Sequence, residues 1–225
     1  MTMAFDAGTK KTIESYVTAH IADEKWHRDF FSFVRNSALA RRLGDEFLSP
    51  RYLYKILEGL EADSWLLRAQ IRMQILSYAS IYEAVIHHVL FECLPDDPKV
   101  VRLTEFPTKK VISIPRESQE LLEKHLVHDG RRIIPTYMAL GRTDETKVRF
   151  DRKAECAFGI GFIEEWLRDD LIEFYEARNA IHIHAEIRKS LKYQIDLSRR
   201  AYLRMEPFRD QVSARLMSLG LLSKI

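Results

Sequence analysis

Residues 63–94 read DSWLLRAQIRMQILSYASIYEAVIHHVLFECL and form the longest stretch of helical periodicity in the chain. Apolar and aromatic residues recur there every three or four positions, which is the repeat of an α-helix; the main stripe is Ile71, Ile75, Tyr78, Tyr82, Val85 and Val89. Other apolar residues lie outside this stripe, so the segment is apolar on more than one side. Such a helix belongs at the centre of a bundle or in a dimer interface. Asp63 or Ser64 is suited to cap its start, and Pro95 to end it.

The segments on either side also predict helices. Pro50 suits the first turn of a helix, so we expect one to begin there. Residues 163–181 predict an amphipathic helix with five inward residues, Trp166, Leu167, Leu171, Phe174 and Tyr175. A last long helix is expected over about residues 188–218, with a kink at Pro207. Because only 8 glycines and 7 prolines interrupt 225 residues, we predict an all-α fold.

The pattern changes in an insert at about residues 98–153. Its first part, PKVVRLTEFPTKKVISIP, has β-branched residues broken by prolines and predicts a small hairpin or an extended arm. A short helix is expected over RESQELLEKHLVH. Residues 99–153 contain thirteen Lys and Arg against eight Asp and Glu, whereas the whole chain has a net charge of only +2. The insert is therefore the best basic patch in the chain.

Several kinds of site are excluded because their motifs are missing. The chain has no GxxxxGK[ST], HExxH or GxSxG, and Gly159-Ile160-Gly161 lacks the third glycine of a dinucleotide fingerprint. Cys93 and Cys156 have no CxxC partner, which excludes a zinc ribbon and favours free thiols in a reducing compartment. No apolar run approaches the roughly 20 residues that span a bilayer. We expect a cytoplasmic protein that uses no cofactor, no metal and no membrane.

Residues 175–190, YEARNAIHIHAEIRKS, concentrate groups suited to phosphodiester cleavage. The imidazole of His182 or His184 can take a proton from a ribose 2′-hydroxyl or give one to the leaving oxygen. Arg178 can hold a phosphate oxygen, and Asn179 can fix an orientation by hydrogen bonding. In a continuous helix Arg178 shares a face with His182, whereas a break in the helix would let either histidine approach it. The choice between the two histidines stays open.

Arg178, Asn179 and His184 resemble the RX4–6H signature of HEPN domains. The order of elements also agrees, because a long apolar helix precedes the motif, a second helix runs into it and a third follows. The resemblance implies a HEPN-like up-down four-helix bundle over residues 61–225, which would contain the basic insert. Residues 1–60 would then form an N-terminal helical extension.

The same resemblance implies an activity. HEPN domains are often metal-independent endoribonucleases of toxin–antitoxin and phage-defence systems, and they usually form homodimers in which two Arg–His pairs share one cleft. Arg178 and His184 would be the catalytic pair, with Asn179 as a polar companion and His182 as the alternative imidazole. Glu83 lies about where many members keep an acidic residue near the cleft. RNA would be the substrate, and an antitoxin or activator protein a further partner.

Residues 154–188 are acidic overall, so RNA would have to be held elsewhere. The candidate nucleic-acid-binding residues are Lys109, Lys110, Arg131, Arg132, Arg199 and Arg200. The acid pairs Glu164-Glu165 and Asp169-Asp170 are expected on a solvated helix face.

Three other interpretations stay open. The chain could be a non-catalytic HEPN-like module that binds RNA or protein and scaffolds a defence or regulatory complex. It could also be a metal-dependent hydrolase with His182, His184 and Glu186 as ligands. In the third interpretation Arg178 has no catalytic role and stacks on the ring of Phe174 or Tyr175.

Overall fold

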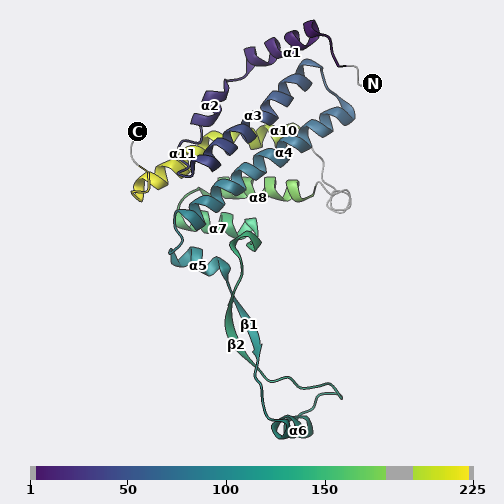
Figure 1. The fold of residues 1–225 in the computed structure, drawn as a ribbon, viewed down its shortest axis with the longest axis vertical. Helices are drawn as coiled ribbons and strands as arrows, with labels where there is room; N and C mark the ends of the chain where they lie inside the picture. Colours follow the sequence, from purple (N-terminus) through teal and green to yellow (C-terminus); the bar gives the residue numbers. More distant parts are fainter. Residues whose placement is uncertain (1–3, 181–194, 223–225) are drawn as a thin grey trace. The chain divides into compact units, whose positions relative to one another are not determined.

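The computed structural model describes residues 4–180 and 195–222, which are predominantly helical (Figure 1). They divide into two units, one from the described parts of Met1–Pro95 and Phe150–Ile225, the other from Asp96–Arg149. The second unit contains a two-stranded sheet. The mainly helical fold and the small β-containing insert agree with the prediction. Within the described residues, every helix is too short or too polar to span a bilayer.

Helix α4 (Ser64–His87) is the central element of the first unit. It packs against α3 (Ser37–Gly59), α7 (Phe150–Ile160), α8 (Glu165–Asn179) and α10 (Ile195–Leu203), and Figure 1 shows it between α3 and α8. Because it has neighbours on several sides, most of its apolar residues are buried. The predicted central position of this helix is confirmed. The helix does not continue regularly to residue 94, since His88–Glu92 form a π-helical turn.

Tyr82 joins α4 to α10 through a buried hydrogen bond. Its hydroxyl donates to the backbone carbonyl of Ala201 over 2.6 Å. That carbonyl lies in the last turn of α10, where helix carbonyls have no partner within the helix. The ring packs on Phe174 and, edge to face, on Phe208. Burial raises the pKa of Tyr82 well above its usual value, which keeps the hydroxyl protonated as a donor.

We predict that Tyr82→Phe lowers the free energy of unfolding by about 1–3 kcal/mol, because it leaves a buried carbonyl without a donor. Urea unfolding followed by circular dichroism measures the change. Tyr52→Phe is the matched control, since Tyr52 lies in α3 of the same unit, is half-buried and makes no hydrogen bond through its hydroxyl within the described residues. Equal losses in the two variants would contradict the role given to the Tyr82 hydroxyl.

The N-terminal helices α1 (Ala7–His20) and α2 (Glu24–Asp29) both pack on α3. The prediction that a helix begins at Pro50 is wrong, because α3 runs through this residue. A proline inside a helix removes one backbone hydrogen bond. The helix continues because Leu43, Phe47 and Pro50 lie on one face and are all buried.

The C-terminal helix is also divided differently from the prediction. The described part contains α10 and α11 (Met205–Ser218), with the break at Arg204, and residues 188–194 lie outside the described residues. Pro207 does not kink a continuous helix but lies in the first turn of α11. A missing amide proton costs little there, because the first amides of a helix have no partner within it.

The second unit contains α5 (Pro98–Thr104), β1 (Glu105–Val111), α6 (Arg116–His125), β2 (Thr136–Arg142) and a 3-10 turn at Glu145–Lys147. β1 and β2 are antiparallel, with Glu105 opposite Arg142 and Val111 opposite Thr136. The predicted segment PKVVRLTEFPTKKVISIP does not form a hairpin by itself, because its first residues form α5 and its strand β1 pairs with β2, which lies beyond α6. Asp97 caps this helix by accepting from the amide of Lys99 over 2.7 Å, and Pro98 occupies its first position.

Candidate functional site

Helix α8 carries the candidate site, and its bounds agree closely with the helix predicted over residues 163–181. Leu167, Leu171 and Phe174 are buried as expected. Trp166 was predicted to face inward, but 40% of its surface is exposed. Its ring lies on the surface because the indole nitrogen donates to Glu164 and the Arg204 guanidinium lies 4.8 Å from the ring centroid. Cation–π contact of this kind stabilises an aromatic ring without burying it.

Arg178 lies in the last turn of α8 and forms an ion pair with Glu83 of α4. Its Nη1 donates to Oε2 of Glu83 over 2.6 Å, and 27% of each side chain is exposed. The guanidinium also lies 5.2 Å from the centroid of the Tyr175 ring. The structure therefore brings Glu83 to Arg178, and the stacking on Tyr175 is present as well. A positive charge at the carboxyl end of a helix is stabilised further by the helix dipole.

This arrangement gives Arg178 the properties of a pre-oriented anion-binding group. A guanidinium has five N–H donors in a rigid fork, and the hydrogen bond to Glu83 takes one of them. The ring of Tyr175 and the carboxylate hold the group from two sides, so a ligand would not have to order it. Partial exposure leaves the group accessible to solvent, and a phosphate oxygen is its typical anionic partner.

The remaining residues of the motif are placed only in part. Asn179 is exposed at the end of α8. His182, His184 and Glu186 lie outside the described residues, so the choice of imidazole and the histidine-based metal site stay predictions. Within residues 4–180 and 195–222, no group of three or more His, Cys, Asp and Glu could hold a metal ion.

His87 follows Glu83 by one turn on the same face of α4, and a Glu–His pair at this spacing could supply two of the ligands of a metal site. Glu83 faces Arg178, whereas Nδ1 of His87 lies 3.2 Å from the Nζ of the buried Lys153. An ammonium group beside an imidazole nitrogen opposes binding of a cation at that nitrogen. The contact with Lys153 therefore favours a structural role for His87 over metal binding.

Four of the basic residues predicted to bind nucleic acid lie in the second unit and are exposed: Lys109, Lys110, Arg131 and Arg132. The two lysines are neighbours on β1, so they point to opposite faces of the sheet. Lys110 lies opposite Tyr137, and Lys109 opposite Met138. The two lysines therefore cannot contact one phosphate backbone from the same face.

Arg199 and Arg200 lie on α10 in the first unit and have different surroundings. Arg200 donates to Glu173, and its Nη1 lies 3.7 Å from Asp170. Asp170 also accepts from Arg204, so only 14% of its side chain is exposed. The expectation of a solvated acid pair is wrong for Asp170, which links α8 to α10. The charge of Arg200 is largely compensated by these acids, whereas Arg199 forms no ion pair within the described residues.

Comparison of the chain with protein-family models, with curated proteins and with solved structures found no match.

We predict that Glu83 and Arg178 are energetically coupled by about 1 kcal/mol, because both side chains are partly exposed and water screens part of their attraction. A double-mutant cycle with Glu83→Gln, Arg178→Gln and the double variant measures this coupling from urea unfolding. Lys25 and Asp29 form an i, i+4 pair on the surface with most of both side chains exposed, and the same cycle there gives the reference. A coupling no larger than that of the surface pair would contradict a specific role for the Glu83–Arg178 contact.

Proposed function

We propose that the chain is a metal-independent RNA endonuclease of the toxin or phage-defence type, which acts as a HEPN-like homodimer. The observation that supports this function is Arg178 itself. It is oriented by Glu83 and Tyr175 at the end of α8, immediately before the segment that contains His182 and His184. An arginine ready for a phosphate, followed within six residues by two imidazoles, supplies the groups that RNA cleavage needs.

In this proposal the 2′-hydroxyl of the substrate is the nucleophile. A histidine takes its proton, the bond from the 2′ oxygen to phosphorus forms, and the bond from phosphorus to the 5′ oxygen breaks. The same imidazole of the other protomer in the proposed homodimer gives a proton to the departing 5′ oxygen, which leaves a 2′,3′-cyclic phosphate and a 5′-hydroxyl. Arg178 would stabilise the charge that grows on the non-bridging phosphate oxygens. Glu83 would be a positioning residue that keeps the guanidinium in place.

We predict that the purified protein cleaves RNA in the presence of EDTA and that Arg178→Ala lowers the rate by about 10²–10³-fold, the usual loss when a transition-state donor is removed. Gel analysis of a mixed RNA pool measures the rate, and mass spectrometry of the fragments identifies 2′,3′-cyclic ends. Arg168→Ala is the matched control, because Arg168 also lies on α8, pairs with acids and lies over an aromatic ring, that of Phe158. This variant should retain full activity.

His182→Ala and His184→Ala, measured in the same assay, identify the catalytic imidazole. Sedimentation equilibrium checks the homodimer. Cleavage that persists in Arg178→Ala and in both histidine variants would contradict the proposed active site. An unfolded Arg178→Ala protein would be recognised by circular dichroism, and Arg178→Lys then replaces it, since lysine keeps the charge but not the planar fork.

A second candidate function, a non-catalytic RNA-binding module, is supported by the second unit. One face of its sheet carries Lys110, Tyr137 and Phe106, and all three side chains are exposed. Exposed rings beside a cation suit stacking of unpaired bases, which contributes about 1–3 kcal/mol per base. The basic loop residues Arg131 and Arg132 precede β2 and add positive charge to the same unit.

We predict that Lys110→Glu combined with Tyr137→Ala weakens binding of single-stranded RNA by about tenfold or more, because the pair loses both a base platform and a phosphate contact. Fluorescence anisotropy with a labelled oligonucleotide at fixed salt measures the affinity. Lys25→Glu makes the same change of charge at a solvent-exposed position of α2 and should have little effect. RNA binding that is lost in the double variant, together with no cleavage under any condition, favours the module over the enzyme. Unchanged affinity would remove the module.

A further inference from the structure

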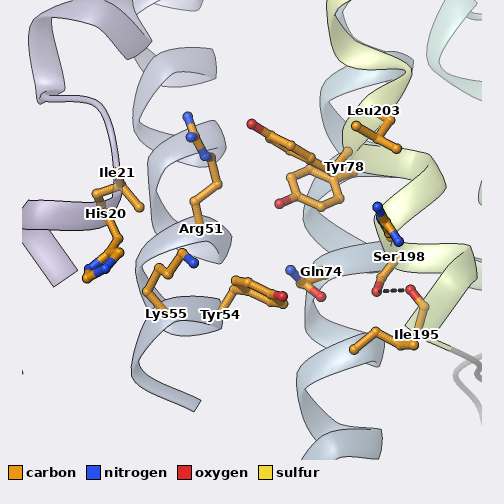
Figure 2. Close-up of a pocket in the computed structure, with 12 residues that line it drawn as sticks. His20, Ile21, Arg51, Tyr54, Lys55, Gln74, Tyr78, Ile195, Ser198 and Leu203 are labelled. Atoms are coloured by element: carbon orange, nitrogen blue, oxygen red, sulfur yellow. Dashed lines mark hydrogen bonds between the residues drawn. The ribbon is translucent and has the colours of Figure 1, made fainter. Parts of the chain in front are cut away.

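A cavity of about 330 Å³ opens in the first unit between α3, α4 and α10, with the end of α1 at its edge (Figure 2). Arg51, Tyr54 and Lys55 line it from α3, Gln74 and Tyr78 from α4, and Arg199 and Tyr202 from α10. Glu83 and Arg178 do not contribute to its wall. The cavity is therefore separate from the Glu83–Arg178 pair.

The wall of this cavity is positively charged. It contains two arginines and a lysine but no acidic side chain. Lys55 is compensated, because its ammonium donates to Glu58. Arg51 and Arg199 form no ion pair within the described residues. Two guanidinium groups without a carboxylate partner at one cavity favour an anionic ligand.

Arg51 is held in place by neutral groups. Its Nη1 lies 2.7 Å from Nε2 of His27, and its guanidinium is 5.2–5.5 Å from the centroids of three aromatic rings, those of Trp26, Phe47 and Tyr202. Nδ1 of His27 donates to the carbonyl of Asp23 over 2.7 Å, which leaves Nε2 as the acceptor. Burial lowers the pKa of His27, so the imidazole stays neutral. The charge of Arg51 is thus oriented but not neutralised.

Gln74 adds an unsatisfied polar group to the wall. Only 5% of its surface is exposed, and its amide oxygen is buried without a hydrogen-bond partner in the described structure. Figure 2 shows its side chain and that of Tyr54 extending toward each other from α4 and α3. An acceptor at the wall of a cavity is satisfied by a donor from water or from a polar group of a ligand other than its anionic head.

We propose that this cavity binds a small organic anion whose carboxylate or phosphate group contacts Arg51 and Arg199. The apolar part of the ligand lies against the rings of Tyr54, Tyr78 and Tyr202. The volume suits a ligand of metabolite size, and the fork geometry of arginine fits the planar oxygens of either anionic group. Aromatic walls at the same cavity favour a ligand with a ring over a free inorganic ion.

Three probes of similar size test the proposal: phenyl phosphate, benzoate and benzyl alcohol. Isothermal titration calorimetry of the full chain should give saturable binding with one site for at least one of the two anions. That anion should bind at least tenfold more tightly than benzyl alcohol, which has the ring without the charge. The tighter of the two anions identifies the head group that the cavity prefers.

Arg199→Gln should weaken binding of the preferred anion by about tenfold, since it removes a hydrogen bond to a charged group. Arg42→Gln is the matched control, because Arg42 is an exposed arginine of α3 that lies outside the cavity and pairs with Glu46. Arg51→Gln should weaken binding as Arg199→Gln does, but it also removes contacts with three aromatic rings and could therefore change folding. Arg199 is exposed, so its replacement tests binding without disturbing the fold. The proposal is overturned by the absence of saturable binding for both anions, by equal affinity for benzyl alcohol, or by unchanged affinity in Arg199→Gln.

Discussion

The burial of α4 on several sides is the constraint on which the rest of the first unit depends. Removing one Leu, Ile or Phe side chain from water contributes about 1.5–3 kcal/mol, and the apolar faces of this helix require α3, α7, α8 and α10 to cover them. The same helix carries Glu83 toward Arg178 and Gln74 to the wall of the cavity. Both candidate sites therefore take their geometry from an element whose position is fixed by packing. A side chain on such an element is oriented more precisely than one on a loop.

Local patterns predicted the helices well where a helix has one clear inward face, as in α8. They failed where a contact distant in the sequence decides the outcome. Pro50 looks like a helix start, yet the burial of its face carries α3 through it. β1 pairs with β2 across the intervening α6, and no local pattern specifies a partner that lies beyond a helix. The π-helical turn after α4 likewise depends on packing and not on a residue signature.

In the candidate sites, too, the sequence predicted single residues but not the contacts between residues that are distant in the sequence. Arg178 could be identified from its spacing to the histidines, and Glu83 from the resemblance, but their contact joins two helices and becomes visible only in the fold. The sequence predicted a solvated side chain for Asp170 because its partners, Arg200 on α10 and Arg204 at the break after α10, are about 30 positions away. Arg51 gave no sequence signal at all. Its three aromatic neighbours come from different helices, so in the sequence it resembles any arginine on a helix surface.

The hydrogen bond between Tyr82 and Ala201 also has a consequence for biosynthesis. Its two residues are 119 positions apart, and a chain grows at roughly 5–20 residues per second. Between the synthesis of Tyr82 and that of Ala201 lies an interval of about 6–24 s at that rate. For most of this interval α4 has been synthesised but α10, which covers part of it, has not. Transiently exposed apolar surface is prone to aggregation, so the central helix that organises the finished protein also needs protection while the chain is being made.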